Sequence, residues 1–558
     1  MIGSKLSQVY RNLISVAMGR EKADLLIENC NIVDVVTGEI YEGSIAVKGD
    51  RIALVGEKVE AYEVFDAKGL YAVPGFIDAH AHPDFYLTLP EYSSLAVKHG
   101  TTTMFSECDA ALNALGVEGF KLFVKWAKEC PARIYINIPY IFPQDPAVED
   151  VNFELSYEEL AKIAGELLVG MGEVLSWSGV IALDEQILKK IDFAMEKNLV
   201  ILGHTAGAKR NKLQAYSTIA SSCHEAIIPE EALEKLKSGL HLMVREGSIR
   251  SDLSIIREVK NVDKSWISLV SDGVDPKKLV EGYMDSIARK AVELGLDPME
   301  VLRMITVNPA KYYGMERDLG VIAPPRYADI VLLKNFEKFE VAKVFVGGKI
   351  PKEARTEDEP YTVMNVEKIE REDLKINADG NVKIRMMRLV TESVTKEVVK
   401  EVEVKDGEVE DFCKVVLVDR FRGNRVVIGF IENLEMEGVV SSTFNFDEYN
   451  ILTMGRDYDE IVKTTNDLIK LGGGIIYSGK TTVELKLPYG GVMSNDVGDV
   501  VRKLEKLNEV LKRDGFEFEN PLNVLYFLTF VTLPELKISN RGLVKVKERK
   551  IVPLVVEG

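Results

Sequence analysis

The chain has 558 residues, a formal net charge of −18 at pH 7, and a composition that is 46% hydrophobic and 28% charged. This length exceeds what one hydrophobic core organises, which predicts two or three domains, and the composition is typical of soluble globular proteins. The negative charge argues against nonspecific binding to nucleic acid or to membrane surfaces. No apolar run approaches the roughly 20 residues that cross a bilayer. No secretory signal pattern opens the chain, so we expect a cytoplasmic protein.

Residues 1–73 are predicted to form a helix followed by the first part of a small β-sandwich. Apolar residues recur at helical spacing within residues 1–24. Short β-prone runs follow, and glycine, asparagine and aspartate separate them. The apolar run at residues 71–77 then predicts one buried strand that leads into the next domain.

From residue 74 to residue 322 the pattern alternates between strands and helices. Eight candidate strands alternate with helical segments, which implies a parallel sheet. Eight such units fit a (β/α)8 barrel, and an open doubly wound sheet is the alternative. No GxGxxG or P-loop motif opens these helices, so nucleotide-cofactor functions lack support. The strands are expected to end near Asp78, Phe105, Ile138, Glu173, Gly203, Cys223, Val244 and Ser271.

The remaining chain predicts two further pieces. Residues 298–313 have the pattern of one more helix, and residues 323–355 return to strand character. We expect residues 323–355 to be the returning part of the β-sandwich, so that the sandwich is split around the barrel. After an acidic linker, residues 361–558 mix strand and helix patterns and predict a third, α+β domain.

Side chains suited to metal binding stand at the ends of the predicted barrel strands. His80 and His82 follow the first strand, and residues two apart point to the same side of a strand. In a (β/α)8 barrel the carboxyl ends of the strands meet at one face, which carries the functional residues. Four histidines and two acids therefore converge there: His80, His82, Glu173, His204, His224 and Asp272.

This ligand set predicts two divalent transition-metal ions. Imidazole and carboxylate ligands suit Mn, Fe and Zn alike, and we expect Mn or Fe first, with Zn as a further option. Each residue alone also has a structural interpretation, since His204 could belong to the core and Glu173 to a solvated loop. The coincidence of six strand-end positions favours the metal site. His99 and His241 do not fit the pattern, and we expect structural roles for both.

Segments along nearly the whole chain resemble the adenine deaminase family of the amidohydrolase superfamily. They include Pro74-Gly-Phe-Ile-Asp-Ala-His-Ala-His82, His99-Gly-Thr-Thr-Thr103, His224-Glu225, Arg245-Glu-Gly-Ser248, Leu471-Gly-Gly-Gly474 and Gly491-Val-Met-Ser494. The resemblance implies a metal-dependent barrel with an additional C-terminal domain. It also implies that the six residues above are the metal ligands, that Glu173 bridges the two ions, and that the protein is a homodimer acting on a purine base or a similar heterocycle.

Several positions near the expected substrate pocket depart from the family's pattern. The family's Ile-Glu-Ser-Ser after the histidine pair is Pro83-Asp-Phe-Tyr86 here, and its Asp-Pro-His-Glu after the second strand is Glu107-Cys-Asp-Ala110. A His-Asp-Ser-His-Asn segment of the third domain is Phe446-Asp-Glu-Tyr-Asn450. The metal positions are therefore intact, while polar positions around them have changed.

The ligand set predicts a hydrolytic reaction. Bound divalent metals lower the pKa of a water molecule from ~15.7 toward 7, which lets it attack an sp² carbon. Asp272 would accept the water's proton and return it to the leaving nitrogen. With adenine, attack at C6 gives hypoxanthine and ammonia. Asp84 and Glu225 are candidates for substrate binding, on position alone, as are Phe85, Tyr86 and Trp177.

Three functions follow from this interpretation. The first is deamination of adenine or a close aminopurine. The second, motivated by the changed pocket positions, is hydrolysis of a different cyclic amide or amino-heterocycle. The third is a non-catalytic protein that keeps the fold, which six costly polar groups converging in a core argue against.

Overall fold

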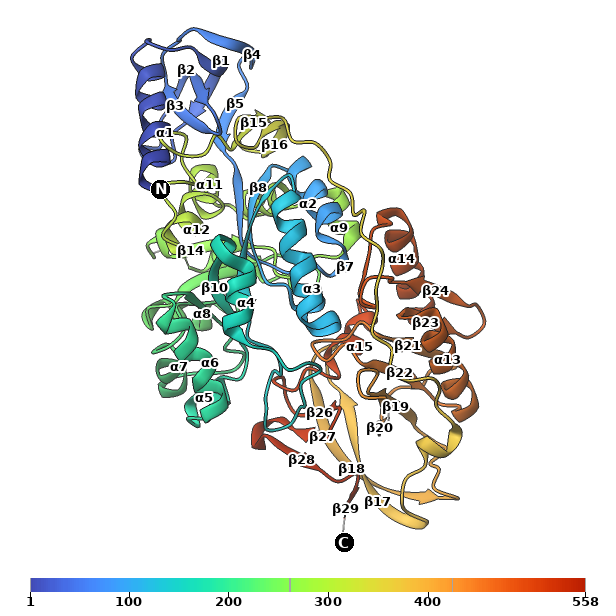
Figure 1. Cartoon of the computed structure of the whole chain (residues 1–558). Coiled ribbons are helices and arrows are strands. Elements are labelled where there is room, and N and C mark those ends of the chain that lie inside the picture. The colour runs from blue at the N-terminus through green and yellow to red at the C-terminus, as the bar shows by residue number, and fades with distance from the viewer. Residues whose placement is uncertain (1, 260–261, 424, 557–558) are drawn as a thin grey trace.

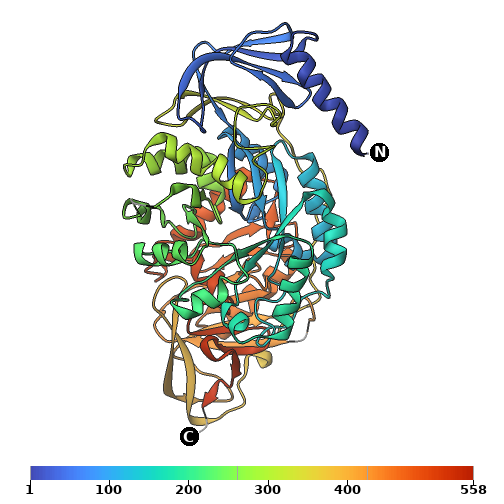
Figure 2. The ribbon, with the colours of Figure 1, turned by 90° about the vertical axis from the view of Figure 1, so that its left-hand side faces the viewer.

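The computed structural model describes residues 2–259, 262–423 and 425–556. Figure 1 shows three parts along the length of the molecule: an N-terminal sheet with helix α1 (Ile2–Ala17), a central barrel and a C-terminal domain. Figure 2 shows the same order after a quarter turn, with the two chain ends at opposite ends of the molecule. Among the described residues, no helix combines the length and apolar character that a membrane crossing requires.

The N-terminal part is one seven-stranded sheet rather than two separate sheets. Strand β1 pairs with β2 on one side, and with β4 and then β5 along the two halves of its other side. The sheet bends over its own core, so that Phe65 of β4 meets Phe345 of β16 with ring centroids 5.3 Å apart. The expected sandwich is thus a single bent sheet, which β15 and β16 join after the barrel. The strands are β1 (Ala23–Val33), β2 (Ile40–Lys48), β3 (Arg51–Val55), β4 (Ala61–Asp66), β5 (Tyr71–Pro74), β15 (Ile330–Asn335) and β16 (Glu340–Phe345).

Gly75 separates this sheet from the barrel, where the sequence predicted one continuous strand. A Cβ atom at this position would lie 2.0 Å from Thr102 Oγ1, so only glycine fits. The Gly75 N–H donates to the carbonyl of Asp329 at 2.8 Å, which ties the junction to the start of β15. The chain therefore ends β5 here and begins the first barrel strand one residue later.

The central part is a closed barrel of eight parallel strands, which excludes the open-sheet alternative. Two ladders run β6-β8-β9-β10-β11 and β12-β13-β14. One seam is closed where Asp272 N–H donates to His80 O at 3.1 Å and His82 N–H to Asp272 O at 3.3 Å. The other seam, between β11 and β12, is closed by a hydrogen bond of 2.9 Å from the Ser221 N–H to the carbonyl oxygen of Ile201. The strands are β6 (Phe76–Ala81), β8 (Thr101–Ser106), β9 (Arg133–Pro139), β10 (Leu168–Val174), β11 (Val200–Gly203), β12 (Ser222–Cys223), β13 (His241–Arg245) and β14 (Ile267–Val270).

Helices follow the barrel strands, and local sequence signals begin several of them. Asp184 accepts from the N–H of Gln186 at 3.0 Å to cap α6, and Asp275 caps α9 in the same manner. The helix expected at residues 298–313 is two helices, because Thr306 has non-helical dihedrals between them. The helices are α2 (Leu89–Lys98), α3 (Asp109–Glu129), α4 (Tyr157–Ala164), α5 (Trp177–Ile181), α6 (Glu185–Glu196), α7 (Asn211–Tyr216), α8 (Pro229–Lys237), α9 (Pro276–Glu281), α10 (Met284–Glu293), α11 (Pro298–Met304) and α12 (Val307–Tyr312).

The C-terminal domain is an α+β unit built on a nine-stranded sheet, with a smaller three-stranded sheet beside it. Helix α13 begins after the cap Asp457 and ends at Gly472, which has a left-handed φ of 82°. Its strands are β17 (Gly380–Leu389), β18 (Thr395–Val404), β19 (Cys413–Val418), β20 (Val426–Ile431), β21 (Val439–Ser442), β22 (Ile451–Gly455), β23 (Gly474–Ser478), β24 (Val483–Lys486), β26 (Leu536–Ser539), β27 (Gly542–Lys545), β28 (Lys550–Val552) and β29 (Val555–Val556), and its helices are α13 (Tyr458–Leu471), α14 (Val497–Arg513) and α15 (Leu522–Phe527).

Aromatic packing seats the C-terminal domain over the mouth of the barrel. Strand β25 (Met493–Ser494) pairs with β7 (Tyr86–Leu87), which lies in the loop after the first barrel strand. Tyr86 stacks on Phe444 at 4.1 Å between ring centroids, and Phe85 stacks on Phe446 at 5.0 Å. These rings are buried, and aromatic pairs add roughly 0.5–1.5 kcal/mol each beyond the area they bury. The C-terminal domain therefore forms one wall of whatever site opens at this end of the barrel.

Candidate metal centre and active site

His80 and His82 stand where β6 ends, and both side chains point into the barrel mouth. The backbone bonds to Asp272 fix this segment, and both imidazoles are almost fully buried. His80 Nε2 lies 3.5 Å and His82 Nε2 lies 3.4 Å from Asp272 Oδ1. His82 Nε2 also lies 3.7 Å from Glu173 Oε1. These four residues form a first group whose ligand atoms all lie within 4.8 Å of one another.

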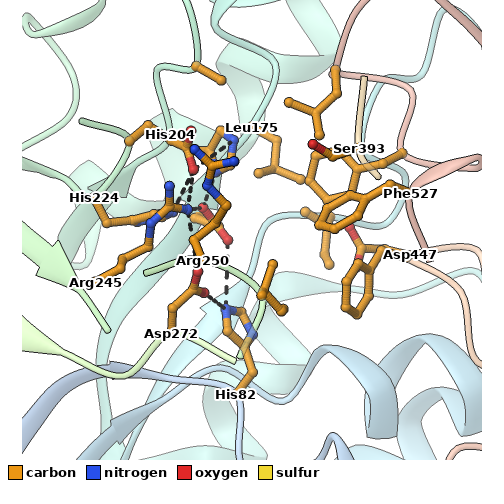
Figure 3. A pocket seen from close by; sticks show the side chains of 18 of the residues that line it. His82, Leu175, His204, His224, Arg245, Arg250, Asp272, Ser393, Asp447 and Phe527 are labelled. Atoms are coloured by element: carbon orange, nitrogen blue, oxygen red, sulfur yellow. Dashed lines mark hydrogen bonds and ion pairs between the residues drawn. The ribbon is translucent and has the colours of Figure 1, made fainter. Parts of the chain in front are cut away.

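Glu173 also belongs to a second group with His204 and His224. Its Oε2 atom lies 2.5 Å from His204 Nδ1 and 2.9 Å from His224 Nε2. One carboxylate thus offers one oxygen to each group, in the manner of a bridging ligand. The six residues that the sequence placed at strand ends are brought together around two neighbouring positions. Figure 3 labels His82, His204, His224 and Asp272 among them.

The chemistry of these groups fits divalent cations. His80 Nε2 is buried and lacks a hydrogen-bond partner among the described residues. Buried polar atoms without partners are costly, which a bound cation relieves by taking the lone pair. Burial alone would raise the pKa of Glu173, but the neighbouring histidines hold the pKa of this carboxyl well below its ordinary value. The site therefore keeps an ionised bridging carboxylate between imidazoles.

Glu107 and Asp109 were not among the site residues predicted from the sequence. Glu107 Oε1 lies 3.3 Å from His80 Nδ1, and Asp109 Oδ2 lies 2.8 Å from His82 Nδ1. Each carboxylate thus faces the imidazole nitrogen that points away from the cation positions. Carboxylates in this place fix the ring orientation and tautomer of metal-binding histidines. The signal was present, since the two acids follow β8 with the same two-residue spacing as His80 and His82.

Replacing Asp109 with asparagine is expected to weaken metal binding by about 10- to 100-fold, because His82 loses the anion that orients its ring. A competition titration of the metal-free protein against a chromophoric chelator measures this constant. Glu118→Gln, on the exposed side of the same helix, is the matched control and should leave the constant unchanged. An unchanged constant in Asp109→Asn would show that the carboxylate is irrelevant to the histidine.

A buried arginine on β13 ties the acids of the site together. Arg245 forms ion pairs with Glu225 and, at 2.9 Å, with Asp252, and its Nη1 lies 3.4 Å from Asp272 Oδ2. Burial would raise the pKa of Glu225, but Arg245 and the two nearest histidines lower it to about 2. The arginine was noted in the sequence only as part of a motif. The guanidinium of Arg245 lies among Glu225, Asp252 and Asp272, and its positive charge compensates their negative charges.

A cavity of about 300 Å³ opens above the two groups of ligands. His82, Glu173, His204 and Asp272 line its barrel side, and Glu225 lies beside them. Phe446, Asp447, Phe527 and Phe530 come from the C-terminal domain and line the opposite side. The cavity has the size of a small-molecule site and the expected mixture of apolar walls with a few placed polar groups.

Of the other predicted substrate-binding residues, only Phe85 lines this cavity. Asp84 is fully buried, and its Oδ2 accepts from the N–H of Ala111 at 2.9 Å in the first turn of α3. It lies in a turn after β6 that ends the alternation of side chains. Asp84 therefore does not line the cavity, and its Oδ2 contacts the start of helix α3.

His99 and His241 lie outside the cavity. His99 Nδ1 is 3.5 Å from Asp285, and His241 Nε2 is 2.8 Å from Ser268 Oγ. Burial lowers the pKa of His241 to about 4 from an ordinary value of 6.5. The unfolded chain therefore binds more protons than the folded one between these values, and stability is lost as the pH falls from 6.5 toward 4.

The His241→Gln variant is expected to remove this contribution, which reaches about 3 kcal/mol at pH 4. Urea unfolding at a series of pH values, with the metal removed by chelator, measures it as the difference between the two proteins. The variant should have the flatter pH profile below 6.5. Parallel profiles would mean that His241 is protonated equally in the folded and unfolded chain.

Comparisons with known proteins agree with this architecture. The model of the amidohydrolase family matches residues 71–350, and that of the adenine deaminase C-terminal domain matches residues 392–550. The adenine deaminase of Cenarchaeum symbiosum is 35% identical over 99% of this chain and 96% of its own length. That of Archaeoglobus fulgidus is 35% identical over 98% of each chain, and that of Moorella thermoacetica is 32% identical over 99% and 98%. The chain therefore belongs to the adenine deaminase family of the amidohydrolases.

Proposed function

We propose that this protein hydrolyses adenine to hypoxanthine and ammonia. The observation that carries the proposal is a full-length relation to proteins named adenine deaminase, combined with a metal-binding set in which none of the six expected ligands is missing. The reaction replaces the amino group at C6 by the oxygen of water. A C–O bond forms, a C–N bond breaks, and the two protons of water end on the purine and on the departing ammonia.

The amidohydrolase family is metal-dependent, and the buried ligand groups fit that requirement. We propose two divalent ions, Mn or Fe first and Zn as a further option. His80, His82, Glu173 and Asp272 would hold one, and Glu173, His204 and His224 the other. When bound, such ions supply Lewis acidity, which makes water nucleophilic at neutral pH.

Asp272 is the proposed acid and base. Its carboxylate stands between the two histidines of β6 and Arg245, which keep its pKa well below the ordinary value although burial acts in the opposite direction. The ionised Oδ1 accepts a proton from the attacking water and passes it to the amino nitrogen, so that ammonia can leave. Arg245 holds the other oxygen, Oδ2, and fixes the direction in which Oδ1 points.

The cavity walls suit a flat heterocycle. Phe85, Phe446 and Phe530 offer ring faces and edges, and the barrel side offers the polar groups. We propose that Glu225 contributes to binding the substrate from its place beside His204 and His224. We further propose, from the family resemblance, that the protein works as a homodimer.

Ammonia release from adenine by the Mn- or Fe-loaded protein tests the function. The chelator-treated protein should be inactive, and restoring the metal should restore turnover. A panel of amino-heterocycles and cyclic amides, assayed in parallel, covers the alternative substrate class, which the relatives do not favour. Turnover of another heterocycle without any turnover of adenine would overturn the proposal.

A further inference from the structure

Asp447 is the feature of the cavity that the reaction above leaves unused. Of the described residues that the C-terminal domain contributes to the lining, it is the one ionisable side chain. The others include Phe446, Phe527 and Phe530, so that this wall is otherwise mostly apolar. Figure 3 shows Asp447 and Phe527 across the cavity from His82 and Asp272.

Asp447 is held in place through only one of its two oxygens. Gln144 Nε2, from the loop after β9, donates to Asp447 Oδ2 at 2.9 Å. The backbone N–H of Gln144 in turn donates to Glu149 Oε2 at 2.9 Å, which fixes the loop. No hydrogen bond to Asp447 Oδ1 is found among the described residues, and because the residue lines the cavity this oxygen is accessible to a molecule bound there.

A carboxylate oxygen that no protein donor occupies can accept a hydrogen bond from a molecule in the cavity. No described cationic side chain forms an ion pair with Asp447. This oxygen therefore offers an acceptor to a bound molecule on the side of the cavity that lies across from His82 and Asp272 (Figure 3). If the carbon that water attacks lies beside the metal ligands, the opposite edge of the heterocycle faces Asp447.

We propose that Asp447 Oδ1 accepts the imidazole N–H of the purine and so selects free bases over bases substituted at that nitrogen. This assignment rests on the proposed function. In adenine the N9–H lies on the edge opposite C6 and can reach a group across the cavity when C6 faces the metal ligands. A site built around a substrate N–H discriminates strongly against analogues that lack it, because its own polar group is then left unpaired.

The test compares adenine with 9-methyladenine, in which a methyl group replaces the N9–H. The wild-type enzyme should prefer adenine in kcat/KM by at least 10- to 100-fold. In Asp447→Leu, which removes the acceptor without opening space, kcat/KM for adenine should fall by about the same factor while that for 9-methyladenine stays. The preference for adenine then disappears because kcat/KM for adenine falls, and not because kcat/KM for 9-methyladenine rises.

Two further variants separate recognition from damage to the fold. Asp447→Asn keeps an oxygen for the purine, because the amide of Gln144 can turn and use Oε1, which has no partner, toward the new amide. This variant should retain part of the preference. Ser393→Ala removes another polar side chain of the same wall and should leave the preference unchanged. Metal content should equal that of the wild type in all three proteins.

Calorimetric binding in an Asp272→Asn background makes the test independent of turnover. Adenine should bind more tightly than 9-methyladenine, and adding Asp447→Leu should equalise the two. Equal binding of both bases when Asp447 is present, or an equal loss for both when it is replaced, would overturn the assignment. Binding that follows the expected pattern without any deamination of adenine would contradict the proposed function but support the role of Asp447.

Discussion

Asp272→Asn is expected to lower kcat for adenine by about 10²- to 10⁴-fold, the range that a positioned acid and base contributes. Asparagine keeps the shape and one oxygen toward His80 and His82, but its amide cannot take the proton that the attacking water must lose. Arg245 still finds Glu225 and Asp252 as partners, so the barrel should remain folded. Steady-state ammonia release at saturating metal measures the loss.

The control for this variant is Asp297→Asn, at the exposed start of α11. Asp297 caps that helix by accepting the N–H of Met299 at 2.9 Å, and asparagine caps equally well. It should have wild-type turnover. Metal analysis of Asp272→Asn should still find the ion held by the group around Glu173, His204 and His224. Turnover close to that of the wild type with full metal occupancy would remove Asp272 from the proton pathway.

Arg245→Met is expected to cost about 3–5 kcal/mol in the free energy of unfolding, because it leaves buried acids without their cation. Glu225, Asp252 and Asp272 all face this guanidinium, and the side chain of Arg245 is 4% exposed. Methionine fills a similar volume, so the loss reports the charge and not a cavity. Urea unfolding of the chelator-treated protein, compared with the wild type, measures the difference.

Two further variants test whether the lost stability comes from the unpaired buried acids. Arg250→Met removes a partly exposed guanidinium 3.6 Å from Asp252, and exposed pairs contribute only about 0–1 kcal/mol. Adding Glu225→Gln to Arg245→Met should recover part of the lost stability, since one unpaired charge is then removed. If Arg245→Met were as stable as Arg250→Met, the acids would not depend on the buried arginine.

Much of the barrel and of its ligand set could be predicted from the sequence, because both follow from one rule. Polar residues that follow buried parallel strands share one face of the barrel, and His80, His82 and Glu173 obey it. Asp84, a candidate on position alone, does not line the cavity, because it lies in the turn after β6 and its side chain accepts from the start of α3.

The site residues that the sequence did not predict depend on contacts between distant parts of the chain, which no local sequence pattern indicates. Asp447 reaches the cavity from another domain, and its partner Gln144 is 303 positions away in the chain. Arg245 could be recognised as important only once Glu225, Asp252 and Asp272 were seen around it. The bend of the N-terminal sheet follows from β1 pairing with both β4 and β5, a tertiary choice that strand propensity leaves open.

Anomalous diffraction from crystals of the protein loaded with Mn locates the bound ions. Two peaks about 3.5–4 Å apart are expected, one among His80, His82, Glu173 and Asp272 and one among Glu173, His204 and His224. Glu173 should bond to both ions. Peaks elsewhere, or none at Glu173 in a protein that still deaminates adenine, would contradict the proposed two-ion centre.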